Sequence, residues 1–133
     1  MIEFEAWFCQ IVTTCELVAS EDALWRTWVG GERTITSIID FGELYEQVFG
    51  DLDAETCSTR FTSMTDNETG ATIQRFLNLV TRVDSLVQSQ PDLKEPATLL
   101  ASISWRDVRE AARAVIELPS TQKCRSGRDD IRI

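Results

Sequence analysis

The chain has 133 residues, a formal net charge of −9 and a hydrophobic fraction of 43%. That length fits one domain built around one core, and the hydrophobic fraction is ordinary for a globular protein. Histidine is absent, which excludes Ser-His-Asp and Cys-His catalysis and the common zinc sites that contain histidine. The negative field of the chain repels nucleic acid and anionic membranes, so neither is expected as a partner.

Apolar residues recur at helical spacing along most of the chain, which predicts an all-α, single-domain bundle of about five to seven helices. The predicted helices span approximately residues 3–18, 20–29, 40–50, 53–61, 71–89, 95–101 and 104–116. The expected N-cap residues are Ser20, Asp40, Asp53 and Ser104. The β-branched run 34–39 has no partner strand and is interpreted as an extended connection. Residues 64–70 are polar and predict a loop.

We expect the helical domain to occupy residues 1–118. Residues 119–133 are polar and mildly basic, with too little apolar surface to fold alone, and are interpreted as a disordered tail or a docking arm. The acidic start of the chain differs from the basic start of a secretory signal, and no apolar run approaches the ~20 residues of a membrane helix. A cytoplasmic protein is therefore expected, with its four scattered cysteines as free thiols.

Charge is distributed unevenly along the sequence. Residues up to Glu68 contain 14 acids and 3 bases, whereas residues from Thr69 onward contain 8 acids and 10 bases. Between Arg33 and Arg60 there are six acids and no base: Asp40, Glu43, Glu46, Asp51, Asp53 and Glu55. Ordinary surfaces intersperse the two signs, so this run favours a surface that binds a cationic partner. Capping alone would account for Asp40 and Glu43, and Asp53 is also a candidate cap.

Other candidate sites have plainer interpretations. The run Asp51-Leu-Asp53-Ala-Glu55 starts like a calcium loop, but Thr56 stands where glycine is needed and Thr62 where the last glutamate is needed. No metal and no cofactor are therefore expected. The four tryptophans are predicted core residues, and one left exposed beside the acids would be a binding hot spot. The arginines of the last predicted helix, Arg106, Arg109 and Arg113, are expected to pair with the acidic half of the chain or with a second copy.

Residues 28–53 resemble immunity proteins of bacterial contact-dependent growth inhibition systems. The similar elements are a tryptophan before a short glycine-containing turn, the Thr36-Ser37 step, and an acidic aromatic helix that ends in Asp51-Leu52-Asp53. This match covers roughly a fifth of the chain. The resemblance implies a binding protein, not an enzyme. It would bind the C-terminal toxin domain of its cognate effector and neutralise it.

Toxin domains of this kind are often nucleases with basic clefts, which suits an acidic inhibitor. The expected contact residues are Glu46, Asp51, Asp53 and Glu55, with Tyr45 as an aromatic anchor. The main alternative is a small all-α adaptor that self-associates as a homodimer, with its acidic half against the arginine-rich helix of its neighbour. A hydrolase that uses only carboxylates is a third reading, because two acids in a cleft need not be close in sequence.

Overall fold

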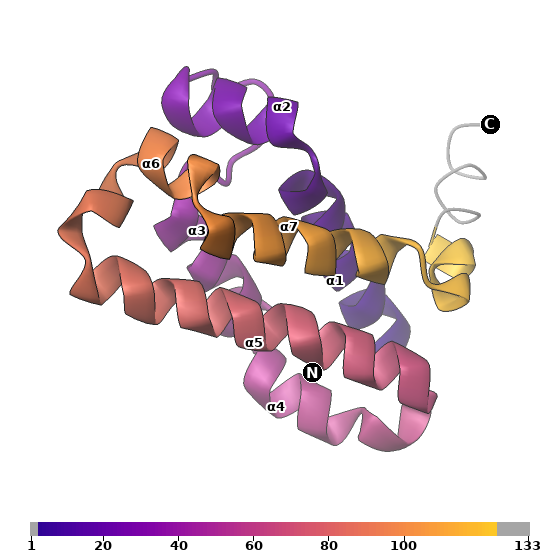
Figure 1. Ribbon diagram of the computed structural model, residues 1–133. Helices are drawn as coiled ribbons and strands as arrows, with labels where there is room; N and C mark the ends of the chain where they lie inside the picture. Colours follow the sequence, from indigo (N-terminus) through magenta and orange to yellow (C-terminus); the bar gives the residue numbers. More distant parts are fainter. Residues whose placement is uncertain (1–2, 125–133) are drawn as a thin grey trace.

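The helices expected from the sequence are present in the computed structural model, which describes residues 3–124. Its α-helices are α1 (Phe4–Ala19), α2 (Glu21–Leu24), α3 (Phe41–Tyr45), α4 (Ala54–Arg60), α5 (Asn67–Ser89), α6 (Pro96–Ala101) and α7 (Ile103–Ile116). The π-helical segments are η1 (Trp25–Val29) and η2 (Glu46–Asp51), and the 3-10 segments are η3 (Thr62–Met64), η4 (Pro91–Lys94) and η5 (Pro119–Thr121). Residues 3–124 contain no strand, so the predicted all-α bundle is confirmed (Figure 1).

The core forms where α7 packs against both α1 and α5 (Figure 1). The side chains at this junction are almost inaccessible to solvent, among them Ile11 on α1, Phe76 and Val80 on α5, and Val108 and Val115 on α7. Each buried side chain of this size contributes roughly 1.5–3 kcal/mol relative to exposure. These three helices form the frame that carries the shorter ones.

Side-chain caps set several helix starts. Ser20 Oγ accepts a hydrogen bond from the Ala23 amide at 3.3 Å, and Asp40 Oδ1 accepts one from the Glu43 amide at 2.8 Å. These contacts confirm two predicted N-caps, because each satisfies an amide that lacks a partner within its helix.

Two other helix starts were predicted at the wrong residue. Helix α5 begins at Asn67 inside the predicted loop, because Asp66 caps it through the Thr69 amide at 2.7 Å. This bond favours the ionised carboxylate and lowers the pKa of Asp66. Helix α7 begins at Ile103, because its cap is Ser102 and not Ser104, with the Trp105 amide at 3.1 Å.

The chain between η1 and α3 is an extended connection, as predicted. It leaves the helix through Gly31, whose φ of +75° suits glycine best. Trp28 Nε1 then donates a hydrogen bond of 2.9 Å to the Ile38 carbonyl. The buried Trp28 ring also contacts Trp105, with 5.4 Å between the ring centroids. This tryptophan therefore holds the end of the connection against the core.

Ordered structure extends beyond the predicted domain boundary at residue 118. Residues 119–121 form η5, and Cys124 is buried. The hydroxyl of Thr121 donates to the carbonyl of Leu118 at 2.7 Å, and Ser120 Oγ lies 2.9 Å from Thr69 Oγ1. Residues 119–124, which the sequence assigned to a disordered tail or a docking arm, therefore contact the helical domain. The remainder of this predicted segment, residues 125–133, lies outside the described residues.

The prediction of four free thiols is also wrong. Cys9 on α1 and Cys124 form a disulfide across a sequence separation of 115 residues, with 5.4 Å between their Cα atoms. Folding brings the two ends of the described chain together at a separation typical of disulfides, which cysteine spacing in the sequence does not reveal. Cys15 and Cys57 are free and buried, and burial raises the pKa of both thiols.

Three of the four tryptophans are core residues, as predicted: Trp7, Trp28 and Trp105. Trp25 differs, because 38% of its surface is exposed. It lies in η1 above the start of α7, where it lines a cavity of about 210 Å³ together with Ile103 and Arg106.

Candidate functional site

Most of the predicted contact residues lie in one continuous stretch of the chain, which we call the acidic segment (residues 46–55). It comprises η2, a short turn and the start of α4. Glu46, Asp51, Asp53 and Glu55 are all exposed. None of these four carboxylates belongs to an ion pair formed within residues 3–124. The segment thus presents four negative charges that the described part of the protein does not neutralise.

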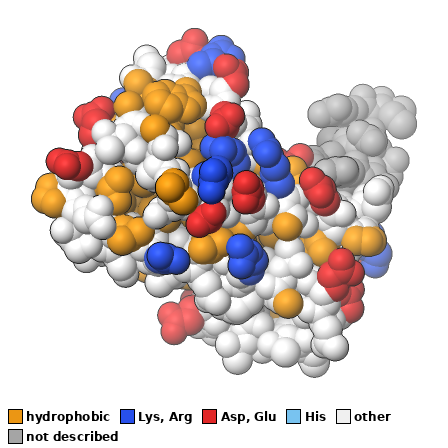
Figure 2. Space-filling view, viewed as in Figure 1, with side chains coloured by type: hydrophobic (Ala, Val, Ile, Leu, Met, Phe, Trp, Pro, Cys, Tyr) orange, Lys and Arg blue, Asp and Glu red, His pale blue; other side chains and the backbone are white. Residues whose placement is uncertain are grey.

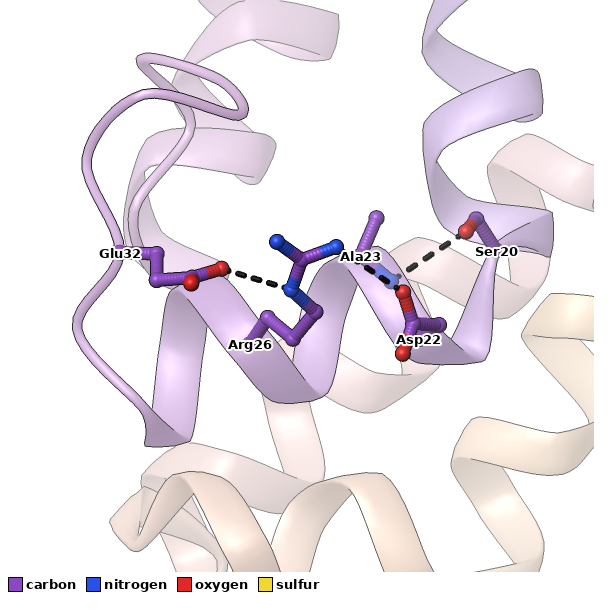
Figure 3. A network of polar contacts seen from close by, with 5 residues as sticks. All are labelled: Ser20, Asp22, Ala23, Arg26 and Glu32. Atoms are coloured by element: carbon purple, nitrogen blue, oxygen red, sulfur yellow. Dashed lines mark hydrogen bonds and ion pairs between the residues drawn. The ribbon is translucent and has the colours of Figure 1, made fainter.

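Four acids elsewhere in residues 3–124 belong to ion pairs. Arg26 bridges Asp22 and Glu32 at 3.3 and 2.7 Å (Figure 3). Arg109 pairs with Glu21 at 2.7 Å, which confirms for this arginine the expected pairing with the acidic half. On the face that displays α5 and α7, basic and acidic side chains are interspersed (Figure 2). The acidic segment differs from this ordinary pattern of charge.

The backbone of the acidic segment begins with a widened helical turn. Helix α3 continues into η2, where the Leu52 amide donates to the Gln47 carbonyl at 2.9 Å, five residues back. Turns of this π type are rare, and they are frequent at functional sites. Glu46 lies within the turn with a carboxylate oxygen beside Gly50, where an added Cβ would approach it to 2.9 Å. This turn fixes how Glu46 and Asp51 are displayed.

Two buried tryptophans fasten the acidic segment and its approach to the core. Trp7 on α1 donates a hydrogen bond of 2.9 Å from Nε1 to the Leu52 carbonyl, 45 residues away in the sequence. Leu52, which separates Asp51 from Asp53, is itself buried. Trp28 holds Ile38 in the same way before α3 begins. The backbone at Leu52 is therefore held in place before any partner binds, which lowers the entropic cost of ordering the acidic segment.

The Trp7 contact gives a stability prediction. Trp7→Phe keeps an aromatic ring but removes the indole donor, so the buried Leu52 carbonyl loses this hydrogen bond. We expect the free energy of unfolding to fall by about 1–3 kcal/mol, measured by denaturant titration. Trp25→Phe is the matched control, since Trp25 is partly exposed and its replacement should change stability by less than about 0.5 kcal/mol. Equal losses in the two variants would contradict the fastening role of Trp7.

Asp53 has a different local role from the one predicted. It occupies the N-cap position of α4, but its side chain makes no capping hydrogen bond. Its backbone lies in the left-handed region, with φ of 43° and ψ of 53°, a conformation that aspartate and asparagine tolerate better than most residues. The aspartate therefore suits the turn between η2 and α4 through its backbone, and its carboxylate remains available to a partner.

Substitutions at Asp53 separate the effect of its left-handed backbone from the effect of its charge. Asp53→Asn keeps a residue that accepts the left-handed conformation and removes the charge, so stability should change by less than about 0.5 kcal/mol. Asp53→Ala should cost roughly 1–2 kcal/mol, because an ordinary Cβ is disfavoured there. Thermal unfolding of both variants checks this pair. If the alanine variant is as stable as the asparagine variant, the left-handed conformation at residue 53 does not disfavour an ordinary side chain.

The aromatic anchor predicted beside the acids is half-buried. The Tyr45 ring lies in a row with Phe41 and Phe49, at centroid distances of 6.4 and 4.8 Å. These residues are four apart on one helical face, so they stack along it. Tyr45 is thereby a rigid ring at the edge of the acidic segment, with part of its surface accessible.

Two of the cavities each contain a pair of carboxylates. One contains Asp40 and Asp84, and another contains Glu5 and Asp66. All four are engaged: Asp40 and Asp66 as caps, Asp84 with Gln88 at 2.9 Å, and Glu5 with Lys123 at 3.8 Å. Within residues 3–124, no three side chains of the metal-binding types gather into a site. None of the helices described there combines the length and hydrophobicity needed to span a bilayer.

Sequence reasoning found the acids but missed what holds them. The hydrogen bond from Trp7, the widened turn at η2 and the left-handed Asp53 all depend on tertiary packing or backbone geometry. Only the left-handed conformation of Asp53 had a local signal in the sequence. Asp53 follows Leu52 and precedes the start of a predicted helix, and aspartate tolerates a positive φ better than most residues do. Comparisons with protein-family models, with curated proteins and with solved structures found no match for this chain.

Proposed function

We propose that this protein is an immunity protein that binds a cognate toxin domain, a basic nuclease, and neutralises it through the acidic segment. The observation that carries this proposal is the set of four exposed, unpaired carboxylates at Glu46, Asp51, Asp53 and Glu55. The resemblance of residues 28–53 to immunity proteins of contact-dependent growth inhibition systems points to the same function.

The electrostatics of the acidic segment suit inhibition of a nuclease. A nuclease binds the phosphate backbone with lysine and arginine, and a cluster of carboxylates can occupy the same cleft. Complementary charge accelerates association and discriminates between partners, and salt weakens it. Because the tryptophan contacts hold the segment in advance, less binding energy is lost in ordering it. Tyr45 supplies an aromatic contact at the edge.

Under this proposal, the protein binds its toxin in the cytoplasm, where the toxin acts. Capture of partners from the native cells tests this directly. Tagged protein should retain one basic domain at low salt and lose most of it at high salt, because the contacts are largely ionic. Retention of only the protein itself, or of a partner whose binding is indifferent to salt, would contradict an acidic interface.

One observation favours the second candidate, a self-associating adaptor. Trp25 and Ile103 are 38% and 70% exposed, and they line one cavity with Arg106. Tryptophan and arginine are enriched among residues that dominate protein–protein binding. Sedimentation over a range of concentrations distinguishes the candidates. A mass that doubles with concentration, and returns to that of a monomer in Ile103→Asp, would favour the adaptor. A constant monomeric mass would count against it.

A further inference from the structure

The disulfide between Cys9 and Cys124 forms part of the wall of a surface cavity. The cavity has a volume of about 330 Å³, and its other lining residues include Phe4, Phe8 and Met64. Cavities of this size admit small organic molecules. Cys9 is only half-buried, so a small thiol that enters the cavity can approach the disulfide while the protein remains folded.

Few other polar contacts hold residues 119–124, which we call the clasp, against α1. The Lys123–Glu5 pair is 3.8 Å long, and the side chains are 84% and 79% exposed, so it contributes little. The buried Thr121 hydroxyl bonds only to the carbonyls of Ile116, the last residue of α7, and of Leu118, two residues later. Apart from the packing of the buried Thr121 and Cys124, the disulfide is therefore the principal link between the clasp and α1.

The opposite end of the clasp is held by one side-chain contact. Ser120 Oγ lies 2.9 Å from Thr69 Oγ1, which joins the clasp to the first turn of α5. A hydrogen bond of this kind contributes about 1 kcal/mol net. Packing of α7 against α1 and α5 does not involve the clasp. Opening of the disulfide therefore leaves the main frame of the protein intact.

The two remaining cysteines do not compete in disulfide exchange. Cys15 is completely buried and Cys57 is 4% exposed. Burial raises the pKa of both thiols, and the thiolate is the form that attacks a disulfide. Neither is therefore poised to attack the disulfide, and both serve as internal controls for any reagent that reaches Cys9 and Cys124.

We propose that Cys9–Cys124 is a thiol–disulfide exchange site, at which a dithiol reductant releases the clasp from α1. The thiolate of the dithiol attacks the Cys9 sulfur, and the Cys124 sulfur leaves and takes a proton. The second thiol of the reductant then attacks the mixed disulfide and loses its own proton. Cys9 is released as a thiol, and the reductant becomes a disulfide. Two electrons pass from the reductant to the protein.

This exchange makes the clasp responsive to its surroundings. Disulfides persist in oxidising compartments and are usually reduced in the cytosol. With the bond closed, the clasp forms one wall of the cavity. With the bond open, that wall is freed, and the Phe4 and Phe8 side of the cavity gains exposure. The redox state of the surroundings thus determines whether this apolar cavity is closed or open.

The test uses the full-length protein with dithiothreitol as the dithiol, under native conditions. After reduction, an alkylating reagent should label Cys9 and Cys124 and leave Cys15 and Cys57 unlabelled, as read by mass spectrometry. Amide hydrogen exchange of residues 120–124 should accelerate by roughly tenfold or more, because opening becomes local. The centres of α5 and α7 should remain protected and exchange far more slowly than residues 120–124.

A matched variant supplies the control. Cys9→Ser/Cys124→Ser should show the fast exchange of residues 120–124 without any reductant, and dithiothreitol should not change it further. Three results would overturn the inference. The disulfide could resist the reagent until the protein is denatured, the clasp could stay protected after both cysteines are labelled, or all helices could exchange as fast as the clasp. The last result would mean that the reduced protein no longer folds.

Discussion

Charge reversal in the acidic segment should weaken toxin binding by at least about 100-fold, or roughly 2.7 kcal/mol. The variant is Glu46→Lys/Asp51→Lys/Glu55→Lys. If the proposed toxin presents a basic cleft, the reversed charges are repelled by it. The association rate should then fall, and its dependence on salt should weaken or invert. The three residues are exposed and have no ion pair within residues 3–124. The helical circular dichroism should therefore be unchanged.

A second triple variant controls for the change in net charge. Asp92→Lys/Glu110→Lys/Glu117→Lys shifts the formal charge by the same amount, also at exposed residues. Its affinity should fall by less than about tenfold, since charges distant from the contact act only through a screened field. Similar losses in the two triple variants would mean that total charge decides the binding, which would contradict the specific role of the acidic segment.

Removal of the disulfide should produce the largest loss of stability that we predict. The bond joins residues 115 apart, and closing so long a loop removes much of the freedom of the unfolded chain. The entropic model gives about 5 kcal/mol for such a loop, and native disulfides usually contribute about 2–5 kcal/mol. Cys9→Ser/Cys124→Ser should therefore unfold at markedly lower denaturant concentration than the oxidised protein, while remaining helical in water.

Reduction of the natural protein serves as the internal control for this loss. The reduced protein should unfold at the same denaturant concentration as the double serine variant, and the reductant should have no effect on that variant. If the oxidised protein is no more stable than the double serine variant, the disulfide does not stabilise the protein by restricting its unfolded chain.

The bundle could be predicted from sequence because its signals are local. Helical spacing of apolar residues located α1, α5 and α7, and the N-caps at Ser20 and Asp40 follow from side-chain chemistry. The start of α5 was misplaced because the polar residues 64–70 were interpreted as a loop. The start of α7 was misplaced because two candidate caps, Ser102 and Ser104, stand close together. Either serine can cap a helix, and the packing of Trp105 and Val108 in the core favours the earlier start.

The candidate site could be predicted only in part. The absence of bases between Arg33 and Arg60 is visible in the sequence, so the exposed acids were found. Their support was not, because the contact from Trp7 to Leu52 joins residues 45 apart. The disulfide was missed for the same reason. Cysteine spacing says nothing about two residues brought together by the path of the whole chain.

The most direct test of the proposed function is protection of living cells. The toxin domain captured from native cells would be expressed together with the natural protein, with the triple variant of the acidic segment, or with its control variant. We predict that the natural protein and the control variant restore growth and that Glu46→Lys/Asp51→Lys/Glu55→Lys does not, at equal protein levels. Growth restored equally by all three would contradict neutralisation through the acidic segment.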